Sequence, residues 1–399
     1  MNLVSYVKEK GVRRAFQVLW RYKIPKLQIK IVAKLTRRRP LEDKIVIESH
    51  NDFDCNGGAF YEYLVGKGLN RTVKIVWRLG HPLDRKLPEN VTSVPLYGPS
   101  WRKAWHICTA KWMTADCVIE EKVRDGQISL YMSHGVLGLK NVKGLISIPS
   151  TVDYVLSPSV SADKALAKGY DMDRTSTHFA HLGYPVLDRL YEKRHSKRYR
   201  PVSPAGKKVF LWMPTFRKGT AYGREDAAGS YPYGVPLIED RETLDRLAEF
   251  ANEKNALIVI KLHPKQDLSQ ISSDVPGGIR FIAPMDVKAL PFDMYDLMLE
   301  SVAMISDYSA ATFEYLALDK PISYVLADLD RYKLGLVEHA DRYMPGEKIC
   351  TLQDLFAFIS DVCAGVDIYS DERIRFRTQF YRWNDSGSSE RISRFLGIE

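Results

Sequence analysis

The feature that most constrains the fold of this chain is an alternation of short apolar runs with helical stretches, which occurs twice along the sequence. The first series begins after Pro40 with residues 44–48 (KIVIE) and extends to Tyr184-Pro185. The second begins with residues 208–213 (KVFLWM) and includes the strongly apolar run 257–262 (LIVIKL). Alternation of this kind predicts mostly parallel sheets covered by helices.

Each series predicts specific elements. In the first, we expect strands at residues 44–48, 74–78, 116–120, 128–132 and 153–156, and helices at 58–66 and near 162–168. In the second, we expect strands at 208–213, 257–262, 280–283, 303–306 and 322–326, and helices at 242–253, 293–299 and 311–318. A last helical stretch, 374–395, is expected to break near residues 384–389.

The segment between the two series, residues 193–204, is basic and flanked by proline. It reads as an interdomain connection that also offers a second basic contact. We therefore predict an α/β protein with a helical arm at 1–40 and two Rossmann-like domains, at 41–200 and 201–399, that enclose a cleft. Whether the terminal helix of the second domain packs back is left open.

The positive charge of the chain is concentrated in the arm. Of the formal net charge of +9, residues 1–40 carry +11, because twelve Lys and Arg residues stand against the single acid Glu9. The rest of the chain therefore carries −2. A near-neutral body argues against a nucleic-acid partner.

The arm also has the pattern of an amphipathic helix. Ile24, Leu27, Ile31 and Leu35 recur at helical spacing, and Pro25 suits a first helical turn. An apolar stripe flanked by lysines is typical of a helix in a membrane interface, where each basic residue near an anionic leaflet contributes about 1 kcal/mol. A solvated helix packed on the body is the alternative. The residues expected to contact lipid are Arg13, Arg14, Lys23, Lys26, Lys30 and Lys34.

Several classes of protein are disfavoured by patterns that the sequence lacks. The longest uncharged run, 126–139, is shorter than the roughly 20 residues needed to span a bilayer. We expect no secretory signal, and five scattered cysteines predict reduced thiols in a cytosolic protein. The dinucleotide fingerprint, the P-loop, HExxH and GxSxG are missing, and no carboxylate cluster has metal spacing, so no metal or cofactor is expected.

The first candidate site is Ser133-His134-Gly135, directly after the apolar run 128–132. A histidine at the carboxyl end of a parallel strand lies where α/β folds place ligands, and Gly135 would let a substrate approach the backbone. Imidazole titrates near neutral pH, so His134 can take a proton from an attacking hydroxyl. Lys140 could meet phosphate. The alternative is a loop histidine that hydrogen-bonds a turn.

The second candidate is His263, which follows the run 257–262 and precedes Pro264-Lys265. Pro264 restricts the direction of His263, and Lys265 adds charge beside it. A histidine that only caps the strand end is the alternative. Asn51, just past the first strand, is a weaker candidate for a ligand contact, since a turn residue explains it more simply.

The third candidate is the segment from Ser306-Asp307 to Tyr315, where a strand gives way to a helix. The free N–H groups of a helix start can bind an anion, and Ser309 and Thr312 can donate to phosphate oxygens. Glu314 could accept from sugar hydroxyls. Plain capping by Ser309, with Glu314 on a solvated face, fits equally well.

Together these segments resemble the CDP-glycerol glycerophosphotransferase family, the enzymes that prime and polymerise wall teichoic acid and related phosphopolyol capsules. Five pieces stand in the family's order between about residues 44 and 330, and five in order are specific although each is weak alone. They are His134-Gly135 with Lys140, Leu182-Gly183-Tyr184-Pro185 with Asp188, Met213-Pro214-Thr215-Phe216-Arg217, Lys261-Leu262-His263-Pro264, and Ser306-Asp307-Tyr308-Ser309 through Glu314-Tyr315 with Lys320-Pro321.

The resemblance implies a GT-B fold and metal-independent transfer of a polyol phosphate, glycerol phosphate first, with release of CMP. The implied donor is CDP-glycerol or CDP-ribitol, and the implied acceptor is a polyprenyl-diphosphate-linked saccharide or a polyol phosphate. It also implies a peripheral enzyme on the cytoplasmic face of an anionic membrane, and it leaves a homo-oligomer open.

The resemblance also implies roles for single residues. His134 would be the general base, and His263 would contact the pyrophosphate. Glu314 would bind the ribose, with Lys140 and Asn51 on the acceptor side. The remaining residues expected to bind the donor or its phosphates are Gly135, Thr215, Arg217, Lys265, Asp307, Ser309 and Thr312.

The sequence departs from the family pattern at three places. Ser133 replaces a tryptophan, residues 136–138 replace Thr-Pro, and Ala310 replaces the second serine of the phosphate block. The acceptor side is therefore expected to differ. Three alternatives stay open: a ribitol phosphate transferase, a GT-B glycosyltransferase that uses a nucleotide sugar, and a non-catalytic membrane scaffold with a degenerate cleft.

Overall fold

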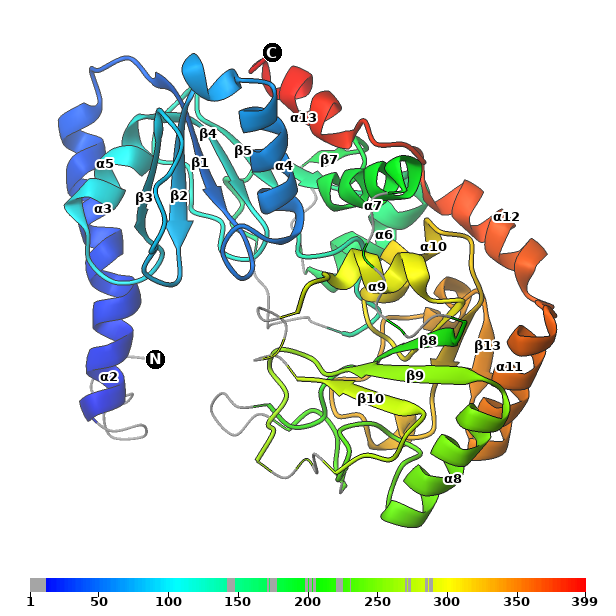
Figure 1. Cartoon of the computed structure of the whole chain (residues 1–399). Helices are drawn as coiled ribbons and strands as arrows, with labels where there is room; N and C mark the ends of the chain where they lie inside the picture. The colour runs from blue at the N-terminus through cyan, green and yellow to red at the C-terminus, as the bar shows by residue number, and fades with distance from the viewer. Residues whose placement is uncertain are drawn as a thin grey trace.

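Two parallel sheets, one in each half of the chain, form the framework of the protein in a computed structural model (Figure 1). The structure describes residues 12–141, 148–170, 172, 178–197, 200, 203, 206–219, 225–229, 231–269, 271, 274–283, 286 and 290–399. The predicted α/β class with parallel sheets is confirmed.

The first sheet has seven strands, and every neighbouring pair is parallel. Its strand order reverses between β1 and β4, and the crevice beyond such a reversal is where open α/β sheets bind ligands. His50 and Cys117 follow these two strands. In spatial order the strands are β3 (Val91–Pro95), β2 (Lys74–Leu79), β1 (Glu42–Glu48), β4 (Ala110–Ala115), β5 (Ile128–Tyr131), β6 (Tyr154–Leu156) and β7 (His178–Ala180).

The second sheet repeats this arrangement with six parallel strands. Its order reverses between β8 and β11, which are followed by Thr215 and Asp307. Its central strands are continuous apolar runs because helices cover both faces. In spatial order the strands are β10 (Ile279–Ile282), β9 (Ala256–Lys261), β8 (Lys208–Met213), β11 (Ala303–Ser306), β12 (Ile322–Val325) and β13 (Glu347–Ile349).

Helices connect the strands and cover the sheets. Those of the first half are α4 (Cys55–Gly66), α5 (Trp101–Thr109), α6 (Val160–Gly169) and α7 (Pro185–Ser196), with a short 3₁₀ turn at Leu69–Arg71. Those of the second half are α8 (Arg241–Glu253), α9 (Met294–Glu300), α10 (Ala311–Leu316), α11 (Leu352–Ala364), α12 (Ser370–Phe380) and α13 (Ser388–Leu396), with 3₁₀ turns at Leu329–Arg331 and Ala340–Tyr343.

The last helix, α13, returns to the first half and packs against α4 and α7 (Figure 1). The indole Nε1 of Trp112 donates a 2.7 Å hydrogen bond to the carbonyl of Leu396, and the buried carboxylate of Asp188 accepts from the N–H groups of Ser388 and Ser389. The buried apolar core is continuous across the two halves, and it includes Tyr381, whose hydroxyl donates to the carbonyl of Phe313.

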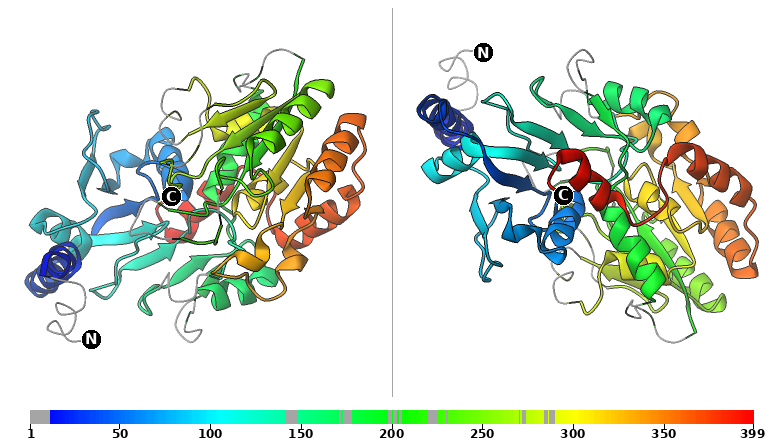
Figure 2. Two further views of the ribbon diagram at one scale, coloured as in Figure 1. Left: turned by 90° about the horizontal axis from the view of Figure 1, so that it is seen from below. Right: turned by 90° about the horizontal axis from the view of Figure 1, so that it is seen from above.

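The arm is helical from Val12 to Thr36, at the edge of the first sheet and far from the second half (Figure 2). It consists of α2 (Val12–Val18), a π-helical turn (Leu19–Lys23) and α3 (Ile24–Thr36). Pro25 lies in the first turn of α3, as predicted. Because Pro25 has no N–H to donate to the preceding turn, a wider turn there is accommodated without a lost hydrogen bond.

Helix α3 has two apolar faces rather than one. Its buried face packs on α5 and consists of Pro25, Gln28, Ile29, Val32 and Thr36. The predicted stripe faces outward: Leu27 is 58% exposed and Leu35 is 75% exposed. The helix therefore packs on the body and still presents apolar side chains to its surroundings. Within the described part of the chain, no helix has the length and apolarity that crossing a bilayer requires.

Some elements differ from the expectation. Residues 116–120 are not a strand; the strand is β4, directly before them, and the carbonyl of Val118 and the carboxylate of Glu120 accept from Arg78 instead of joining the sheet. The expected connection at 193–204 begins inside α7, where Lys193 pairs with Asp293 and Asp296. Strands β3, β7 and β13 and helices α5, α7 and α11 were not predicted.

Candidate active site

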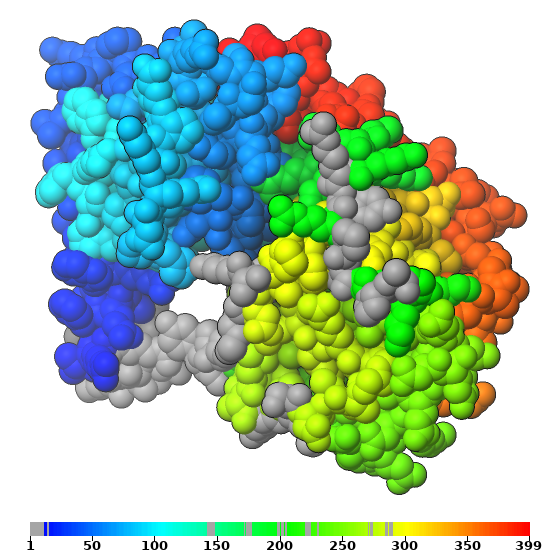
Figure 3. Space-filling view, in the orientation of Figure 1, coloured from blue at the N-terminus to red at the C-terminus, as the bar shows by residue number. Residues whose placement is uncertain are grey.

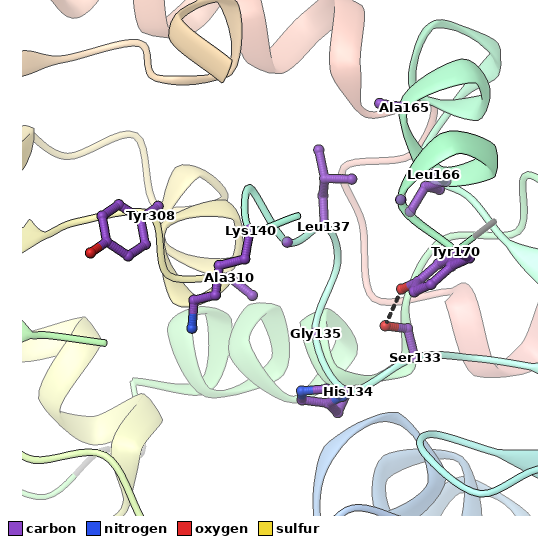
Figure 4. Close-up of a pocket in the computed structure, with 12 residues that line it drawn as sticks. Ser133, His134, Gly135, Leu137, Lys140, Ala165, Leu166, Tyr170, Tyr308 and Ala310 are labelled. Carbon is purple, nitrogen blue, oxygen red and sulfur yellow. Dashed lines mark hydrogen bonds between the residues drawn. The ribbon is translucent and has the colours of Figure 1, made fainter. Parts of the chain in front are cut away.

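His134 lies at the carboxyl end of β5, on the edge of the first sheet that faces the second half (Figure 4). The preceding residue, Ser133, has the left-handed φ of 64°, and its hydroxyl lies 2.9 Å from the hydroxyl of Tyr170. This bond fixes a backbone conformation that is uncommon for serine, and it therefore fixes the direction in which His134 leaves the strand.

Two side chains contact the imidazole of His134. The ring of His50, from the loop after β1, stacks on it with a centroid separation of 4.8 Å and an interplanar angle of 12°. The thiol of Cys117, which follows β4, lies 3.4 Å from Nδ1. His134 is exposed to the cleft on its remaining side.

Gly135 serves a different purpose from the one predicted. A side chain there would place its Cβ 3.2 Å from the Cβ of Ala310 and 3.7 Å from Oε1 of Glu314, and the φ of Gly135 is 109°. The glycine therefore lets α10 of the second half approach the His134 loop, rather than leaving room for a substrate at that atom.

His263 follows β9, on the facing edge of the second sheet. Its Nδ1 accepts a 3.0 Å hydrogen bond from the backbone N–H of Lys265, and its ring centroid lies 4.9 Å from that of Phe216. These contacts fix the orientation of the ring. The Phe216 ring in turn lies 5.9 Å from Nζ of Lys140, a residue of the first half.

The two histidines share an electropositive environment. Although one side of His134 is exposed to the cleft, desolvation by the surrounding protein lowers its pKa, and the nearby charges of His50, Lys265 and Lys140 lower it further. Burial also lowers the pKa of His263, again together with Lys140 and Lys265. Both rings are therefore neutral at pH 7. Lys140 and Lys265 therefore act electrostatically on both histidines.

Glu314 lies on α10 between the two halves and is 7% exposed. Burial raises its pKa to about 7, while Lys261 and a hydrogen bond from Tyr295 oppose the shift. Within the described residues its Oε2 has no hydrogen-bond partner. The other oxygen, Oε1, is the one near Gly135. A buried carboxyl oxygen without a partner is suited to accept from a ligand hydroxyl.

Arg217 is bound to acidic side chains of the protein. It is 1% exposed, and its guanidinium binds Asp307 at 2.7 Å and Asp328 at 2.7 and 2.9 Å. Thr215 is also buried and donates to Asp307 through its N–H and its hydroxyl. These three predicted donor-binding residues form a buried ionic network that ties the ends of β8 and β11 to Asp328. Their side chains are engaged within the protein, and direct contact of Arg217 and Thr215 with the donor stays a prediction.

The helix start near Ser309 also needs correction. Helix α10 begins at Ala311, and the residue before it is Ala310, which has no capping side chain. Thr312 is fully buried and its hydroxyl donates to the carbonyl of Ser309, so it is already engaged. Ser309, which is partly exposed, remains the member of this pair that a ligand can reach.

Lys140 lines a cavity of about 110 Å³ together with His134, Ser133, Tyr170 and Ala310 (Figure 4). Both halves therefore contribute to its wall, and they meet on the face shown in Figure 3. Asn51 lies at the cleft but makes local contacts: its N–H donates to Asp54 over 2.8 Å, and its amide nitrogen lies 2.9 Å from Nδ1 of His50. The turn explanation for Asn51 fits these contacts.

Among the described residues, one set of side chains has the spacing of metal ligands: His50, Asp54 and Cys55, with ligand atoms within 4.8 Å of one another. Nδ1 of His50 and Oδ1 of Asp54 already have protein partners in Asn51. We assign no metal to this set. All five cysteines are in the described part of the chain, and none is in a disulfide there.

Sequence reasoning missed His50, Cys117 and Tyr170. His50 directly precedes the candidate Asn51 at the end of the first strand, so its position was a usable signal. Cys117 and Tyr170 gave none, because their proximity to His134 and Ser133 depends on the strand order. Of the residues predicted to contact lipid, Lys23, Lys30 and Lys34 are exposed on the arm, and Lys26 pairs with Glu121. The side chain of Arg14 and residues 1–11 lie outside the described part.

The chain is similar in sequence to enzymes of teichoic acid synthesis. It is 28% identical over 223 residues to the teichoic acid glycerol-phosphate primase of Bacillus spizizenii, a match that spans 55% of this chain and about half (51%) of that relative. It is 25% identical over 400 residues to the teichoic acid glycerol-phosphate transferase of Staphylococcus aureus, covering 91% of this chain and 95% of that one.

In structure, the chain resembles the wall teichoic acid polymerase TagF, with a TM-score of 0.69 and 19% identity over 98% of this chain and 97% of that one. At this identity the likeness supports the fold. A sequence model described as CDP-glycerol:poly(glycerophosphate) glycerophosphotransferase matches residues 31–397. This match covers nearly the whole chain and confirms the resemblance seen in the motifs: the protein belongs to the CDP-glycerol:poly(glycerophosphate) glycerophosphotransferase family.

Proposed function

We propose that this protein transfers glycerol phosphate from CDP-glycerol to a hydroxyl of a lipid-linked or polymeric acceptor in teichoic acid or capsule synthesis, with release of CMP. The observation that carries the proposal is the placement of His134 after β5 and of His263 after β9, two imidazoles at the carboxyl ends of parallel strands, with Lys140 at the wall of the cavity beside His134. Family membership supplies the donor class.

In this reaction His134 is the general base. The acceptor oxygen attacks the phosphorus that carries the glycerol, the bond from that phosphorus to the bridging oxygen of CMP breaks, and His134 takes the acceptor proton. A lowered pKa keeps His134 in the neutral form that can accept a proton.

The charge that develops on the phosphoryl oxygens is met by groups of the second half. His263 donates to the pyrophosphate through Nε2, and Lys265 contributes a positive charge at the cleft. Ser309 adds a hydroxyl, and Glu314 accepts from a ribose hydroxyl. Asp307 acts indirectly, since it holds Arg217 and Thr215 beneath this surface.

The two repeated sheets support a GT-B arrangement of an acceptor domain at 41–200 and a donor domain at 201–399, with the donor mainly on the second. The cavity beside His134, with Lys140 at its wall, is the acceptor side in this arrangement.

We further propose that the protein is peripheral on the cytoplasmic face of an anionic membrane and docks through the arm. Exposed apolar side chains support this location: Phe16 and Trp20 are 60% and 52% exposed, and Leu27 and Leu35 are 58% and 75% exposed. Exposed lysines alternate with them, and a surface of this composition suits the interface of a bilayer.

The function is tested by release of CMP from CDP-glycerol in the presence of a glycerol-phosphate-primed lipid disaccharide, with CDP-ribitol and UDP-sugars in parallel. CMP release from CDP-glycerol that depends on the acceptor is expected. Transfer from a UDP-sugar alone would replace the proposal by a glycosyltransferase, and no release from any donor would favour a scaffold. CDP-ribitol is the second candidate donor, because relatives of this chain include a teichoic acid ribitol-phosphate polymerase.

A further inference from the structure

His50 occupies the end of β1, where the strand order of the first sheet reverses. The loop that carries it is held at several points. Asn51 donates its N–H to Asp54, and Asp52 accepts from the backbone N–H groups of Gly80 and His81. Phe53 packs on Trp77 with a centroid separation of 4.4 Å. The position of the His50 loop is therefore set by contacts within the first half and does not depend on a bound ligand.

The imidazole of His50 lies against the face of His134, not in line with its nitrogens. The centroid separation of 4.8 Å and the angle of 12° define an offset stack, a geometry that aromatic pairs favour. Nδ1 of His50 faces the amide of Asn51 at 2.9 Å, and Oδ2 of Asp54 is 3.9 Å away. These neighbours set the rotation of the His50 ring and therefore the plane that it offers to His134.

The second contact of His134 acts at a different place. Cys117 lies 3.4 Å from Nδ1, at the edge of the ring. Cys117 therefore limits rotation of the His134 ring within its plane, and His50 limits the tilt of the ring. Nε2 is the nitrogen that neither contact engages. A general base must lie within about 3 Å of the proton that it abstracts, so the tilt of the ring matters.

We propose that His50 is a positioning residue for the transfer reaction, and that its ring acts as a wall that holds the imidazole of His134 at the angle required for proton abstraction. The proposal rests on the proposed function of His134 as general base. His50 itself takes no proton and contacts no reacting atom in this role. A flat aromatic ring should therefore replace it, whereas a small side chain should not.

The test compares His50→Phe, which keeps a flat ring, with His50→Ala, which removes it. His178→Ala is the matched control, because His178 is exposed at the amino end of β7, on the opposite edge of the same sheet. Two measurements are made on the full-length protein. The first is the ring-proton chemical shift of His134 in histidine-labelled protein, assigned with His134→Gln. The second is kcat and KM for CDP-glycerol.

We expect His50→Ala to move the His134 resonance, because the ring current of its neighbour is lost, and to lower kcat by at least about tenfold with KM little changed, since small misplacements of a catalytic group can cost up to about 10²-fold. His50→Phe should keep an upfield-shifted His134 resonance and a kcat within about threefold of the parent, a tolerance well inside that misplacement cost. His178→Ala should change neither measurement.

Two results would overturn the inference. One is a His50→Ala protein whose His134 resonance and kcat match the parent. The other is a His50→Phe protein as impaired as His50→Ala, which would show that a nitrogen of His50 is needed. Because the resonance of His134 is measured without turnover, the stacking is tested even if no donor releases CMP. Failure of the proposed function and failure of the positioning role are thus distinguishable.

Discussion

The backbone N–H of Lys265 donates to Nδ1 of His263 over 3.0 Å. Because Nδ1 accepts, the neutral ring must carry its proton on Nε2, and the side chain is a hydrogen-bond donor toward the cleft. This tautomer suits a contact with a phosphate oxygen and does not suit a base at Nε2. The two histidines of the cleft are thereby given different roles by their local contacts.

Substitution of His263 tests this donor role. We expect His263→Ala to lower kcat by about 10²–10³-fold, the usual cost of removing one donor to a developing negative charge. His263→Gln should lose less, because its amide can place an N–H near the position of Nε2. The measurement is the rate of CMP release at saturating donor, with His178→Gln as control. Equal losses for Ala and Gln would contradict a donor role.

The pH dependence of the reaction should report the charge around His134. Its pKa is lowered from the ordinary value of 6.5, so kcat/KM should fall only when the pH drops below that value. The charge of Lys265 contributes to the lowering, and Lys265→Ala should therefore move the acidic limb of the profile to higher pH. Lys67→Ala, at the far end of α4, should leave the limb in place. If the acidic limb of the Lys265→Ala profile stays at the pH of the parent, the titrating group is not His134.

The raised pKa of Glu314 makes a prediction about stability. The unfolded carboxyl ionises near pH 4.5, whereas the folded one ionises at about 7. Between these values the unfolded state releases a proton that the folded state retains, so stability falls as the pH rises and levels off above pH 7. Glu314→Gln removes this penalty. Its gain in unfolding free energy should be absent below pH 4.5 and reach up to about 3 kcal/mol above pH 7.

Urea unfolding of Glu314→Gln at pH 5 and pH 8, beside the exposed substitution Glu249→Gln, measures this difference. A gain of equal size at both pH values would contradict the assignment, since a packing effect does not depend on protonation.

The buried network around Arg217 should be essential for stability. Arg217→Met leaves Asp307 and Asp328 buried without their cation, and removal of one partner of a buried ion pair typically costs about 3–5 kcal/mol. Arg217→Lys should rescue little, because one ammonium cannot match the bidentate contact with Asp328 and reach Asp307 as well. Denaturation midpoints measure the loss, with the exposed substitution Arg246→Met as control. Normal stability combined with weaker donor binding would support a direct role for Arg217.

The outer face of the arm should bind membranes. The double substitution Leu27→Glu/Leu35→Glu removes two exposed apolar side chains and reverses local charge, and we expect at least about tenfold weaker partition onto anionic vesicles, since each buried leucine contributes roughly 1.5–3 kcal/mol. Ile368→Glu is the matched control, because Ile368 is 73% exposed on the second half and Leu35 is 75% exposed. Vesicle sedimentation at low and high salt is the measurement, and unchanged binding of the double variant would place the docking surface elsewhere.

The central strands were predictable from sequence because their burial leaves a local signature. Residues 208–213 and 303–306 match β8 and β11, since strands covered on both faces read as continuous apolar runs. Strand β4 was predicted at residues 116–120, directly after its actual position at Ala110–Ala115. Lys111 and Thr114 interrupt the apolar pattern of the strand itself, while Val118 and Ile119 just after it have the apolar, β-branched character of a strand. Edge strands β3 and β7 carry too little apolar sequence to stand out.

The site residues likewise differ in whether the local sequence could predict their roles. His134 and His263 were predictable because each follows a recognisable strand and belongs to a family motif. The role of Arg217 was not, because its partners Asp307 and Asp328 lie 90 and 111 residues away in the chain. The stack between His50 and His134 likewise depends on strand order, which no local pattern encodes.

The return of α13 to the first half has a consequence for synthesis of the protein. Ile392 and Leu396 fill the core beside α4 and α7, and the carbonyl of Leu396 satisfies the indole of Trp112 on β4. The first sheet thus receives part of its packing from residues that follow the second sheet in the chain. A nascent chain that has emerged only to the end of the second sheet would have an unfinished first half. The cleft is therefore expected to assemble only after α13 has been synthesised, so the first half does not complete its folding before the second half has been made.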